Sequence, residues 1–477
     1  MTLPPLDWSL LLVVSEWLIR LTMLFVVPQR RNPAATRTWL LLIFLEPWIG
    51  LLLYLAIGRI SLPKRRLEIK ERASLRIRTA QQQWLARGKI AEPDIPPELN
   101  QAVLLARNLG DLGIVDGNEF ELIDDYEEMI RRLIADIDAA KFHVHLLFYI
   151  FADDETGHRV ADAVVRAAKR KVHCRVLMDD SGSSRALRRL APKMRHAGAS
   201  VTAMLPVSLF RHKAARFDLR NHRKIVVIDG TIGYAGSQNI VNAESQPGLV
   251  NEELVVRVRG PLVAQLQVVF LADRYIEREE LVEEPELFPA PVEVGTAAAQ
   301  VLPSGPGYQF ANAQKAMVAL IHGARERVVI TTPYFIPDEA FLQAMQTAVL
   351  RGVEVDLVVS AKADHKLVNW AQESYYEALL EAGVRIHRYR PRFLHAKHMS
   401  IDGSVALIGS SNVDLRSFTL NNEITLLIYD APVVAKLRVI QERYFAHSDQ
   451  VCAKEWAQRS LFKKVLQNTA RLTDSLL

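Results

Sequence analysis

Two long apolar runs open the chain, and shorter apolar runs alternate with amphipathic stretches over the rest of it. Residues 8–27 and residues 38–58 consist almost entirely of apolar side chains. Each run has roughly the 20 residues that a helix needs to cross the hydrocarbon core of a bilayer. We therefore predict a membrane-embedded helical hairpin within residues 1–60. We do not expect a cleaved signal peptide, because no lysine or arginine precedes Trp8.

Charged residues interrupt both runs near their centres. Glu16 and Arg20 stand four residues apart in the first run, where they can pair on one helix face. Glu46 stands beside Pro47 in the second run. A charge at the centre of a span raises the free energy of insertion by about 2.5–3.5 kcal/mol, so neither run is an ideal membrane span.

A basic segment follows the second run. Residues 59–78 contain eight lysines and arginines against two glutamates, a larger surplus than the net charge of +5 of the whole chain. Because basic residues collect on the cytoplasmic side of membrane helices, we expect residues 61–95 to form a basic juxtamembrane linker. Both ends of the hairpin and the remainder of the chain would then lie in the cytoplasm. Arg30 and Arg31, taken with the first run alone, favour the opposite orientation.

The composition is that of a folded globular protein. Of the 477 residues, 49% are hydrophobic and 24% are charged, which excludes a disordered or fibrous chain, and the length allows two or three domains. The two cysteines, Cys174 and Cys452, lie far apart and outside any spacing typical of metal ligands. Neither a disulfide framework nor a zinc site is therefore predicted.

One motif occurs twice. NHRKIVVIDGTIGYAGSQN at residues 221–239 and LHAKHMSIDGSVALIGSSN at residues 394–412 share six polar or glycine positions at one constant offset. These are His222, Lys224, Asp229, Gly236, Ser237 and Asn239 in the first copy, and His395, Lys397, Asp402, Gly409, Ser410 and Asn412 in the second. Two copies with the same spacing are far beyond chance, which indicates an internal duplication.

Weaker matches extend the duplication on both sides. VHLLFYIFADDE resembles VVITTPYFIPDE upstream, and NEELVVRV resembles NNEITLLI downstream, which pairs Glu253 with Glu423. Apolar runs of five to eight residues alternate with helical stretches, the pattern of β–α units around a mainly parallel sheet. We predict an α/β fold of two tandem lobes, residues 96–290 and residues 291–477, which together form one pseudo-twofold active site.

The repeated residues are suited to bind a phosphodiester. A histidine and a lysine two positions apart in a strand point to the same face, so both can reach one ligand. Asp229 and Asp402 have the opposite parity and stand in Asp-Gly turn signals, so we expect them to brace the turn and nearby charges. The following hydroxyl and amide side chains can hydrogen-bond phosphate oxygens. They are Ser237, Asn239, Ser410 and Asn412.

Two such half-sites brought face to face supply the groups that metal-free phosphodiester transfer needs. His222 and His395 would lie on opposite sides of the phosphorus, one attacking unprotonated and the other donating a proton, because imidazole titrates near neutral pH. The lysine of each copy would stabilise charge on the phosphate oxygens. Glu253 and Glu423 can each hold one histidine ring through its far nitrogen. No metal ion or other cofactor is expected.

These motifs resemble those of the phospholipase D superfamily, over about residues 100–450. More narrowly, RNHRKIVVIDG, TTPYFIPDEAF, QESYYEALLEAGV, FLHAKHMSIDG and SSNVDLRSFTLNNE, behind two apolar runs, resemble bacterial cardiolipin synthases. The resemblance implies two phospholipase D-like lobes and a location at the bacterial inner membrane. The catalytic set that it implies is His222, Lys224, Asp229, His395, Lys397 and Asp402.

The resemblance also implies a reaction, the transfer of a phosphatidyl group from one phosphatidylglycerol to another with release of glycerol. His222 would become the phosphatidyl-histidine, and His395 would act first as general acid and then as general base. The likeness of the two motifs leaves the choice of the attacking histidine open. Phospholipids and the bilayer are the expected partners, and no nucleic acid is expected. A homodimer is allowed but not required, because one chain holds both half-sites.

The chain departs from these synthases in two places. Residues 235–239 read AGSQN where the synthases more often have two glycines, and residues 251–253 read NEE where they tend to have a Trp-Arg-Asp run. A basic cluster either receives anionic headgroups or forms a solvated face. It consists of Arg211, Lys213, Arg216, Arg220 and Arg223. Of the other histidines, His143, His145 and His398 are interpreted as structural.

Three other functions fit parts of the pattern. A hydrolase of the same superfamily would use water as acceptor and release phosphatidic acid, and the acceptor depends on how well the closed site excludes water. A nuclease has no need of membrane helices, and no aromatic stripe for base stacking is evident. A catalytically inactive lipid-binding scaffold would not need either histidine.

Overall fold

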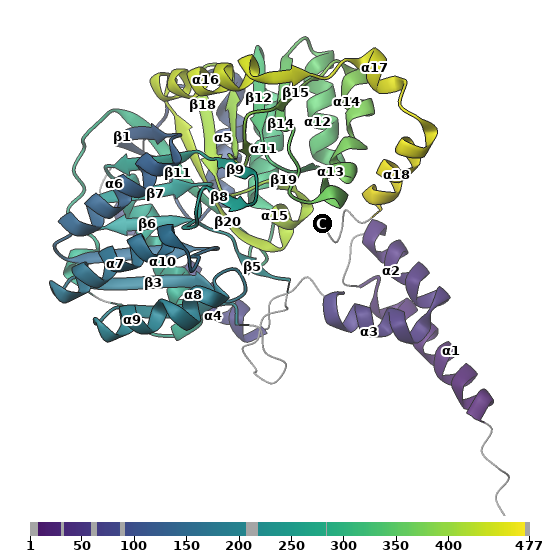
Figure 1. The fold of residues 1–477 in the computed structure, drawn as a ribbon, viewed down its shortest axis with the longest axis horizontal. Helices are drawn as coiled ribbons and strands as arrows, with labels where there is room; N and C mark the ends of the chain where they lie inside the picture. Colours follow the sequence, from purple (N-terminus) through teal and green to yellow (C-terminus); the bar gives the residue numbers. More distant parts are fainter. Residues whose placement is uncertain are drawn as a thin grey trace, which may run out of the picture. The chain divides into compact units, whose positions relative to one another are not determined.

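The computed structural model describes residues 8–29, 33–58, 64–85, 91–206, 218–282 and 284–472. The chain divides into two compact units. The first consists of residues 1–62 with residues 216–218, and the second consists of residues 63–215 with residues 219–477. Figure 1 shows the elements of both units, coloured along the sequence.

Three apolar helices make up the described part of the first unit. They are α1 (Trp8–Val26), α2 (Pro33–Leu45) and α3 (Pro47–Ile57). Of the helices in the described ranges, α1 alone is long and apolar enough to cross a membrane. Glu16 and Arg20 pair within α1 at 3.3 Å, as their spacing predicts. Arg20 also donates from Nε to the carbonyl oxygen of Phe44 at 3.1 Å, which ties α1 to α2.

The second apolar run is not one continuous span. Its helix is interrupted at Glu46, whose φ of −133° and ψ of 84° are not helical. The ring of Pro47 causes this break, because proline lacks an N–H donor and disfavours the helical conformation in the residue before it. The two helices that result have 13 and 11 residues. At about 1.5 Å per residue each is shorter than a hydrocarbon core of about 30 Å, so the predicted continuous span over residues 38–58 does not hold.

The predicted juxtamembrane linker contains a helix, α4 (Lys64–Leu85), that packs against α10 (Leu262–Arg278) in the second unit. Arg66 forms a two-point ion pair with Glu277, with distances of 2.7 and 2.8 Å, and both side chains are buried. Lys70 is buried beside Tyr308, with Nζ 3.2 Å from the centre of the ring. Part of the basic surplus is therefore used inside the protein and does not face lipid headgroups.

The second unit contains two lobes built from matching elements. The first lobe contains β1 (Val115–Ile123), α6 (Tyr126–Ala139), β2 (His143–Phe148), α7 (Glu155–Lys169), β3 (His173–Asp179), α8 (Ser184–Arg189), α9 (Ala191–His196), β4 (Ser200–Met204), β5 (Arg220–Asn221), β6 (Ile225–Ile228), β7 (Ile232–Gly236), β8 (Glu244–Gln246), β9 (Leu249–Glu252), β10 (Val255–Arg259) and α10. The second lobe contains β11 (Ala297–Ser304), α11 (Asn312–Gly323), β12 (Arg327–Thr331), β13 (Phe335–Ile336), α12 (Glu339–Leu350), β14 (Glu354–Ser360), α13 (Lys366–Glu373), α14 (Tyr376–Ala382), β15 (Arg385–Tyr389), β16 (Phe393–Leu394), β17 (His398–Ile401), β18 (Val405–Gly409), β19 (Val413–Asp414), α15 (Leu415–Thr419), β20 (Asn421–Tyr429), α16 (Ala431–Ala446), β21 (Ser448–Gln450), α17 (Ala453–Ala457) and α18 (Leu461–Arg471).

The strands of the two lobes pair in the same order, which confirms the α/β fold of two tandem lobes. From edge to centre the first lobe runs β4-β3-β2-β6-β7-β10-β1, and the second runs β15-β14-β12-β17-β18-β20-β11. β1 and β11 pair antiparallel where the lobes meet, which relates the lobes by an approximate twofold axis. The parallel pairing that was predicted occurs only in the outer strands of each lobe. β6 with β7 and β17 with β18 are antiparallel, because an Asp-Gly turn reverses the chain between them.

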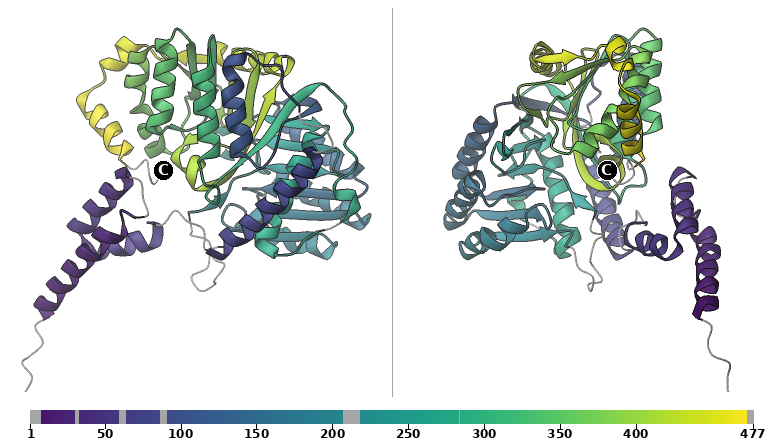
Figure 2. Two further views of the ribbon diagram at one scale, coloured as in Figure 1. Left: turned by 180° about the vertical axis from the view of Figure 1, so that it is seen from behind. Right: turned by 45° about the vertical axis from the view of Figure 1, so that its right-hand side comes forward.

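Sheet faces meet between the lobes, and helices cover the outer faces. β7 packs against β18 and β20, within an apolar core to which both lobes contribute. α6, α7 and α9 cover the first lobe, and α11, α12 and α14 cover the second (Figures 1 and 2). α5 (Asn100–Leu109) packs beside α11 on the second lobe, although the sequence division places residues 96–290 in the first lobe. Its apolar face finds its partner across the domain boundary, which sequence order does not reveal.

Candidate active site

The two histidines of the repeated motifs are held by short strand pairs that cross between the lobes. β5 runs beside the start of β20, and β16 runs beside β9. The residue after each short strand is the histidine. The backbone N–H of His222 donates to the carbonyl oxygen of Asn422 at 2.9 Å, and that of His395 donates to the carbonyl oxygen of Glu252 at 2.8 Å. Each histidine is therefore anchored on the lobe opposite to the one that carries it.

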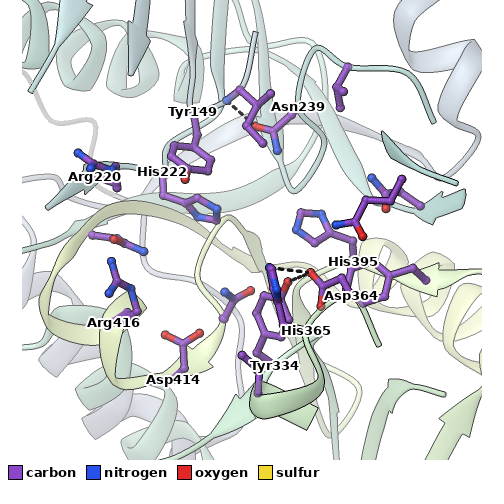
Figure 3. Close-up of a pocket in the computed structure, with 18 of the residues that line it drawn as sticks. Tyr149, Arg220, His222, Asn239, Tyr334, Asp364, His365, His395, Asp414 and Arg416 are labelled. Carbon is purple, nitrogen blue, oxygen red and sulfur yellow. Dashed lines mark hydrogen bonds and ion pairs between the residues drawn. The ribbon is translucent and has the colours of Figure 1, made fainter. Parts of the chain in front are cut away.

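The histidine side chains repeat this exchange. Nδ1 of His222 lies 3.1 Å from Oε2 of Glu423, and Nδ1 of His395 lies 2.7 Å from Oε1 of Glu253. The sequence left the pairing of histidines with glutamates open, and the structure pairs each histidine with the glutamate of the other lobe. Because Nδ1 is engaged, Nε2 of each ring remains for a ligand, and Figure 3 shows the two rings facing each other across the pocket.

The two pairs differ in their protonation. Burial raises the pKa of Glu423 to about 7. Burial acts in the same direction on Glu253, but the neighbouring His395 outweighs it, and the pKa of Glu253 is lowered. Burial lowers the pKa of both histidines, reinforced at His222 by the nearest lysine and opposed at His395 by Glu253. The pKa of His222 lies well below its usual value, so this ring is held neutral, whereas His395 faces an ionised carboxylate that supports a proton on the ring.

Lys224 and Lys397 lie one layer behind the histidines. Nζ of Lys224 donates to the carbonyl oxygen of His222 at 2.7 Å, and Nζ of Lys397 donates to that of His395 at 2.6 Å. Burial lowers the pKa of Lys224 to about 7 and that of Lys397 to about 8. An anionic phosphate between the histidines would raise both pKa values, so phosphate binding and lysine protonation reinforce each other.

A pocket of about 610 Å³ lies between the lobes, with both histidines in its wall. Asn239 and Asn412 of the repeated motifs also line it. Oδ1 of Asn239 accepts a hydrogen bond from the backbone N–H of Ile150 at 3.1 Å. The group that Asn239 can offer to a phosphate oxygen is therefore its amide N–H.

Several pocket residues were not singled out from the sequence. Tyr149 follows β2, and Tyr334 follows β12. Asp364 and His365 follow β14, and the hydroxyl of Tyr334 donates a hydrogen bond to Asp364. All of these residues stand after the carboxyl ends of buried parallel strands, the edge at which α/β sheets place their ligands. That position is the signal by which the sequence could have shown them.

Asp229 and Asp402 lie at the turns of the two hairpins and do not belong to the pocket wall. Each carboxylate accepts hydrogen bonds from three consecutive backbone N–H groups at the start of a neighbouring strand. The donors are Lys141, Phe142 and His143 to Asp229, and Arg325, Glu326 and Arg327 to Asp402. Both aspartates have a positive φ, 50° and 51°. Their contacts brace the turn against the sheet.

Ser237 and Ser410 do not reach the phosphate position for which the sequence suggested them. Their backbone N–H groups continue the ladders to Leu254 and Ile424, beside the two glutamates. Each serine is buried, and its side chain consequently faces the carboxylate and not the pocket. Oγ of Ser410 donates to Glu423, and a hydrogen bond from Ser237 helps to lower the pKa of Glu253. The serines support the glutamates, which in turn hold the histidines.

The predicted basic cluster is divided by the structure. Arg220 lines the pocket. Arg223 is buried and pairs with Asp273, while its Nε donates to the carbonyl oxygen of Glu423 at 2.9 Å and its Nη2 to that of Ser304 at 3.2 Å. Arg223 therefore joins the two lobes and does not receive a headgroup. Arg211, Lys213 and Arg216 lie outside the described residues.

The remaining histidines are part of the core. His145 stacks on Phe270 with ring centres 4.5 Å apart, and burial lowers the pKa of His143 to about 4 and that of His398 to about 3. Among the described residues, no group of three or more histidine, cysteine, aspartate or glutamate side chains is arranged to hold a metal ion.

Comparison with known proteins agrees with this geometry. The family model described as "Cardiolipin synthase, PLD-like domain" matches residues 133–274 and 317–445, one match in each lobe. A second model, "Phospholipase_D-nuclease N-terminal", matches residues 17–59. The crystal structure of phosphatidylserine synthase from Haemophilus influenzae superposes with a TM-score of 0.60 at 16% identity, over 79% of this chain and 98% of that one, which supports the fold.

Curated relatives match nearly the whole chain. Cardiolipin synthase A of Pectobacterium atrosepticum is 35% identical over 474 residues, which cover 96% of each chain. Cardiolipin synthase A of Serratia proteamaculans is 35% identical over 475 residues, and that of Proteus mirabilis is 34% identical over 477 residues, with 96% and 97% of each chain covered. With two phospholipase D-like lobes and this similarity along its length, the chain belongs to the bacterial cardiolipin synthase family of the phospholipase D superfamily.

Proposed function

We propose that this phosphatidyltransferase makes cardiolipin by moving a phosphatidyl group from one phosphatidylglycerol to a second, with release of glycerol, through a phosphohistidine intermediate on His222. The observation that carries the proposal is the pair of imidazole rings, each held at Nδ1 by a glutamate of the other lobe, that face each other across one pocket. The relatives that span the whole chain bear the name cardiolipin synthase A.

In the first step Nε2 of His222 forms a bond to the phosphorus of phosphatidylglycerol. The bond from phosphorus to the glycerol oxygen breaks on the opposite side, and His395 gives its proton to that oxygen. His222 attacks because its ring is held neutral, and Glu423 stabilises the positive charge that the ring gains. His395 carries the proton because ionised Glu253 faces it.

In the second step a hydroxyl of another phosphatidylglycerol enters where glycerol left. His395, now neutral, takes the hydroxyl proton while the new oxygen–phosphorus bond forms and the bond to His222 breaks. Lys224 and Lys397, with the amide of Asn239, stabilise the charge on the phosphate oxygens in both steps. Asp229 and Asp402 act as positioning residues, through the turns that hold the two hairpins.

We propose that α1 anchors the protein in the inner membrane and that the two lobes lie on its cytoplasmic side. The broken second apolar segment, α2 and α3, would also lie within the bilayer, where Pro47 and Glu46 are tolerated if neighbouring helices cover the break. Phospholipid and not nucleic acid is the proposed substrate. One chain supplies both histidines, so the chemistry needs no second subunit, and a homodimer is compatible with it.

The test is mass spectrometry of the products formed from phosphatidylglycerol alone by the full-length protein in mixed micelles. Cardiolipin with an equal amount of glycerol is expected, and both should disappear in His222→Ala and His395→Ala. Phosphatidic acid as the main product would instead identify a hydrolase. Lipid binding without turnover in the wild type would identify a scaffold, and unchanged turnover in His222→Ala would overturn the mechanism.

A further inference from the structure

The pocket has two chemically different ends. Figure 3 places Arg220 and Arg416 on the side of His222, and Asp364 on the side of His395. The arginines suit an anionic phosphate. A carboxylate repels phosphate and suits a hydrogen-bond donor, so the end beside His395 is made for another part of the substrate.

Only the second lobe supplies this carboxylate. Asp364 stands four residues after the end of β14, and Ser183 stands four residues after the end of the matching strand β3. Ser183 is buried, donates to the carbonyl oxygen of Tyr149 at 2.9 Å and accepts from the backbone N–H of Phe151 at 2.8 Å. It is therefore spent on the fold. The approximate twofold symmetry of the site is broken at this position.

Asp364 and Tyr334 form a preset acceptor and hydroxyl pair. The Tyr334 hydroxyl donates to Oδ2 of Asp364, and within the described residues no hydrogen bond reaches Oδ1. Burial, with the nearby Asp364 charge, keeps the pKa of Tyr334 well above its usual value, so its hydroxyl stays protonated. The ring of Tyr334 lies 6.3 Å from that of Phe393, which in turn stacks 6.0 Å from the ring of His395. The pair is thus fixed beside the proposed acid.

In-line displacement decides what occupies this end. When His222 forms its bond to phosphorus, the breaking bond points away from His222, toward His395, which protonates the departing oxygen. The alcohol that leaves, and the alcohol that later returns its proton to His395 as it attacks, both occupy the end with Asp364 and Tyr334. We propose that Asp364 and Tyr334 form an alcohol subsite that binds the free hydroxyl groups of the glycerol headgroup in both steps. This inference rests on the function proposed above.

A hydroxyl group fits this subsite better than the ammonium group of ethanolamine. Asp364 already accepts from Tyr334, and it interacts electrostatically with Lys397. A second cation in this place would meet the charges of both active-site lysines, whereas a neutral diol gains hydrogen bonds at no such cost. His365, whose Nε2 lies 3.9 Å from Oδ2 of Asp364, is mostly exposed and stands at the rim.

The experiment isolates the acceptor step. The donor is the p-nitrophenyl ester of phosphatidic acid, whose leaving group needs no proton and has no glycerol hydroxyls, so p-nitrophenol release reports formation of the phosphoenzyme. The phosphoenzyme then divides between water, which gives phosphatidic acid, and added glycerol, which gives phosphatidylglycerol. The ratio of these products does not depend on how much of a variant is folded. Methanol and ethanolamine serve as comparison acceptors.

Asp364→Asn and Tyr334→Phe should lower the glycerol-to-water ratio about 10- to 100-fold, the loss expected for a hydrogen bond to a charged group, and leave the methanol-to-water ratio within about twofold. Tyr149→Phe, the same change on the His222 side of the pocket, should leave both ratios unchanged. An equal fall for methanol, or no fall for glycerol, would overturn the subsite. Ethanolamine used better than glycerol by the wild type, and lost in Asp364→Asn, would overturn the diol as its ligand. No p-nitrophenol release by the wild type would refute the proposed function itself.

Discussion

Glu423 of the second lobe holds Nδ1 of His222 of the first lobe, at 3.1 Å, and the matching pair of Glu253 and His395 runs in the opposite direction. Neither lobe therefore contains a complete catalytic dyad. A change of a few tenths of an ångström in the packing of the lobes would move each histidine relative to its own glutamate. The apolar core between the sheets is in this way part of the catalytic geometry.

Glu253→Gln should move the alkaline limb of the pH profile of kcat/KM to lower pH by about one unit. Glu253 opposes the lowering of the His395 pKa, so removing its charge lowers that pKa further, and His395 loses its catalytic proton at lower pH. The measurement is the initial rate of cardiolipin formation from pH 5 to pH 9. Glu423→Gln is the matched control and should leave this limb in place. An alkaline limb that stays put or rises in Glu253→Gln would contradict the role of His395 as acid.

His395→Ala should accumulate the phosphoenzyme when the donor is the p-nitrophenyl ester of phosphatidic acid. That leaving group departs without an acid, and the variant then lacks the base that activates the acceptor. A burst of p-nitrophenol and a phosphatidyl adduct on the peptide that contains His222 are the expected results, by stopped-flow absorbance and mass spectrometry. An adduct found on His395 of His222→Ala would reverse the assignment of the two histidines.

Asp229→Ala should destabilise the protein by about 3 kcal/mol, because three backbone N–H groups lose a charged acceptor. Thermal unfolding measures the effect. Asp229→Asn should lose less, since asparagine keeps one acceptor oxygen and tolerates the positive φ at this position. Unchanged thermal stability combined with loss of turnover would instead place Asp229 in the chemistry.

Arg223→Met should destabilise the protein by about 3–5 kcal/mol, since it leaves Asp273 as a buried charge without its partner. Combining it with Asp273→Leu should recover at least half of that loss, because the remaining charge is then removed as well. Denaturant unfolding of the two single variants and the double variant gives the coupling energy. Losses that simply add would show that the ion pair does not join the lobes.

Arg66→Ala should release α4 from the first lobe, because the variant leaves Glu277 buried without its partner. Faster hydrogen exchange of the backbone amides in α4 is the expected readout. Arg65→Ala removes an exposed partner of Glu279 on the same helix and should have little effect. Equal exchange in the two variants would mean that α4 is held by other contacts.

Much of the active site could be predicted from the sequence, because its chemistry is duplicated. The constant offset between the motifs identified both histidines, both lysines and the asparagines before any contact was known, and the parity of Asp229 and Asp402 already separated them from the ligand face. Ser237 and Ser410 were misplaced, because the sequence does not show that their strands pair with the glutamate-bearing segments. Tyr334 and Asp364 were missed because they follow strands of only one lobe and leave no repeat.

The sequence by itself determined the two-lobe architecture, the residue types of the reaction and the apolar N-terminal segment, since hydrophobic periodicity and spacing are local properties of the chain. It did not determine the break in the second apolar run, where Pro47 outweighs hydropathy. Only the tertiary structure decided which glutamate holds which histidine, which ring is neutral and which end of the pocket carries Asp364. These depend on burial and on contacts between residues up to about two hundred positions apart, and neither can be read from neighbours in the sequence.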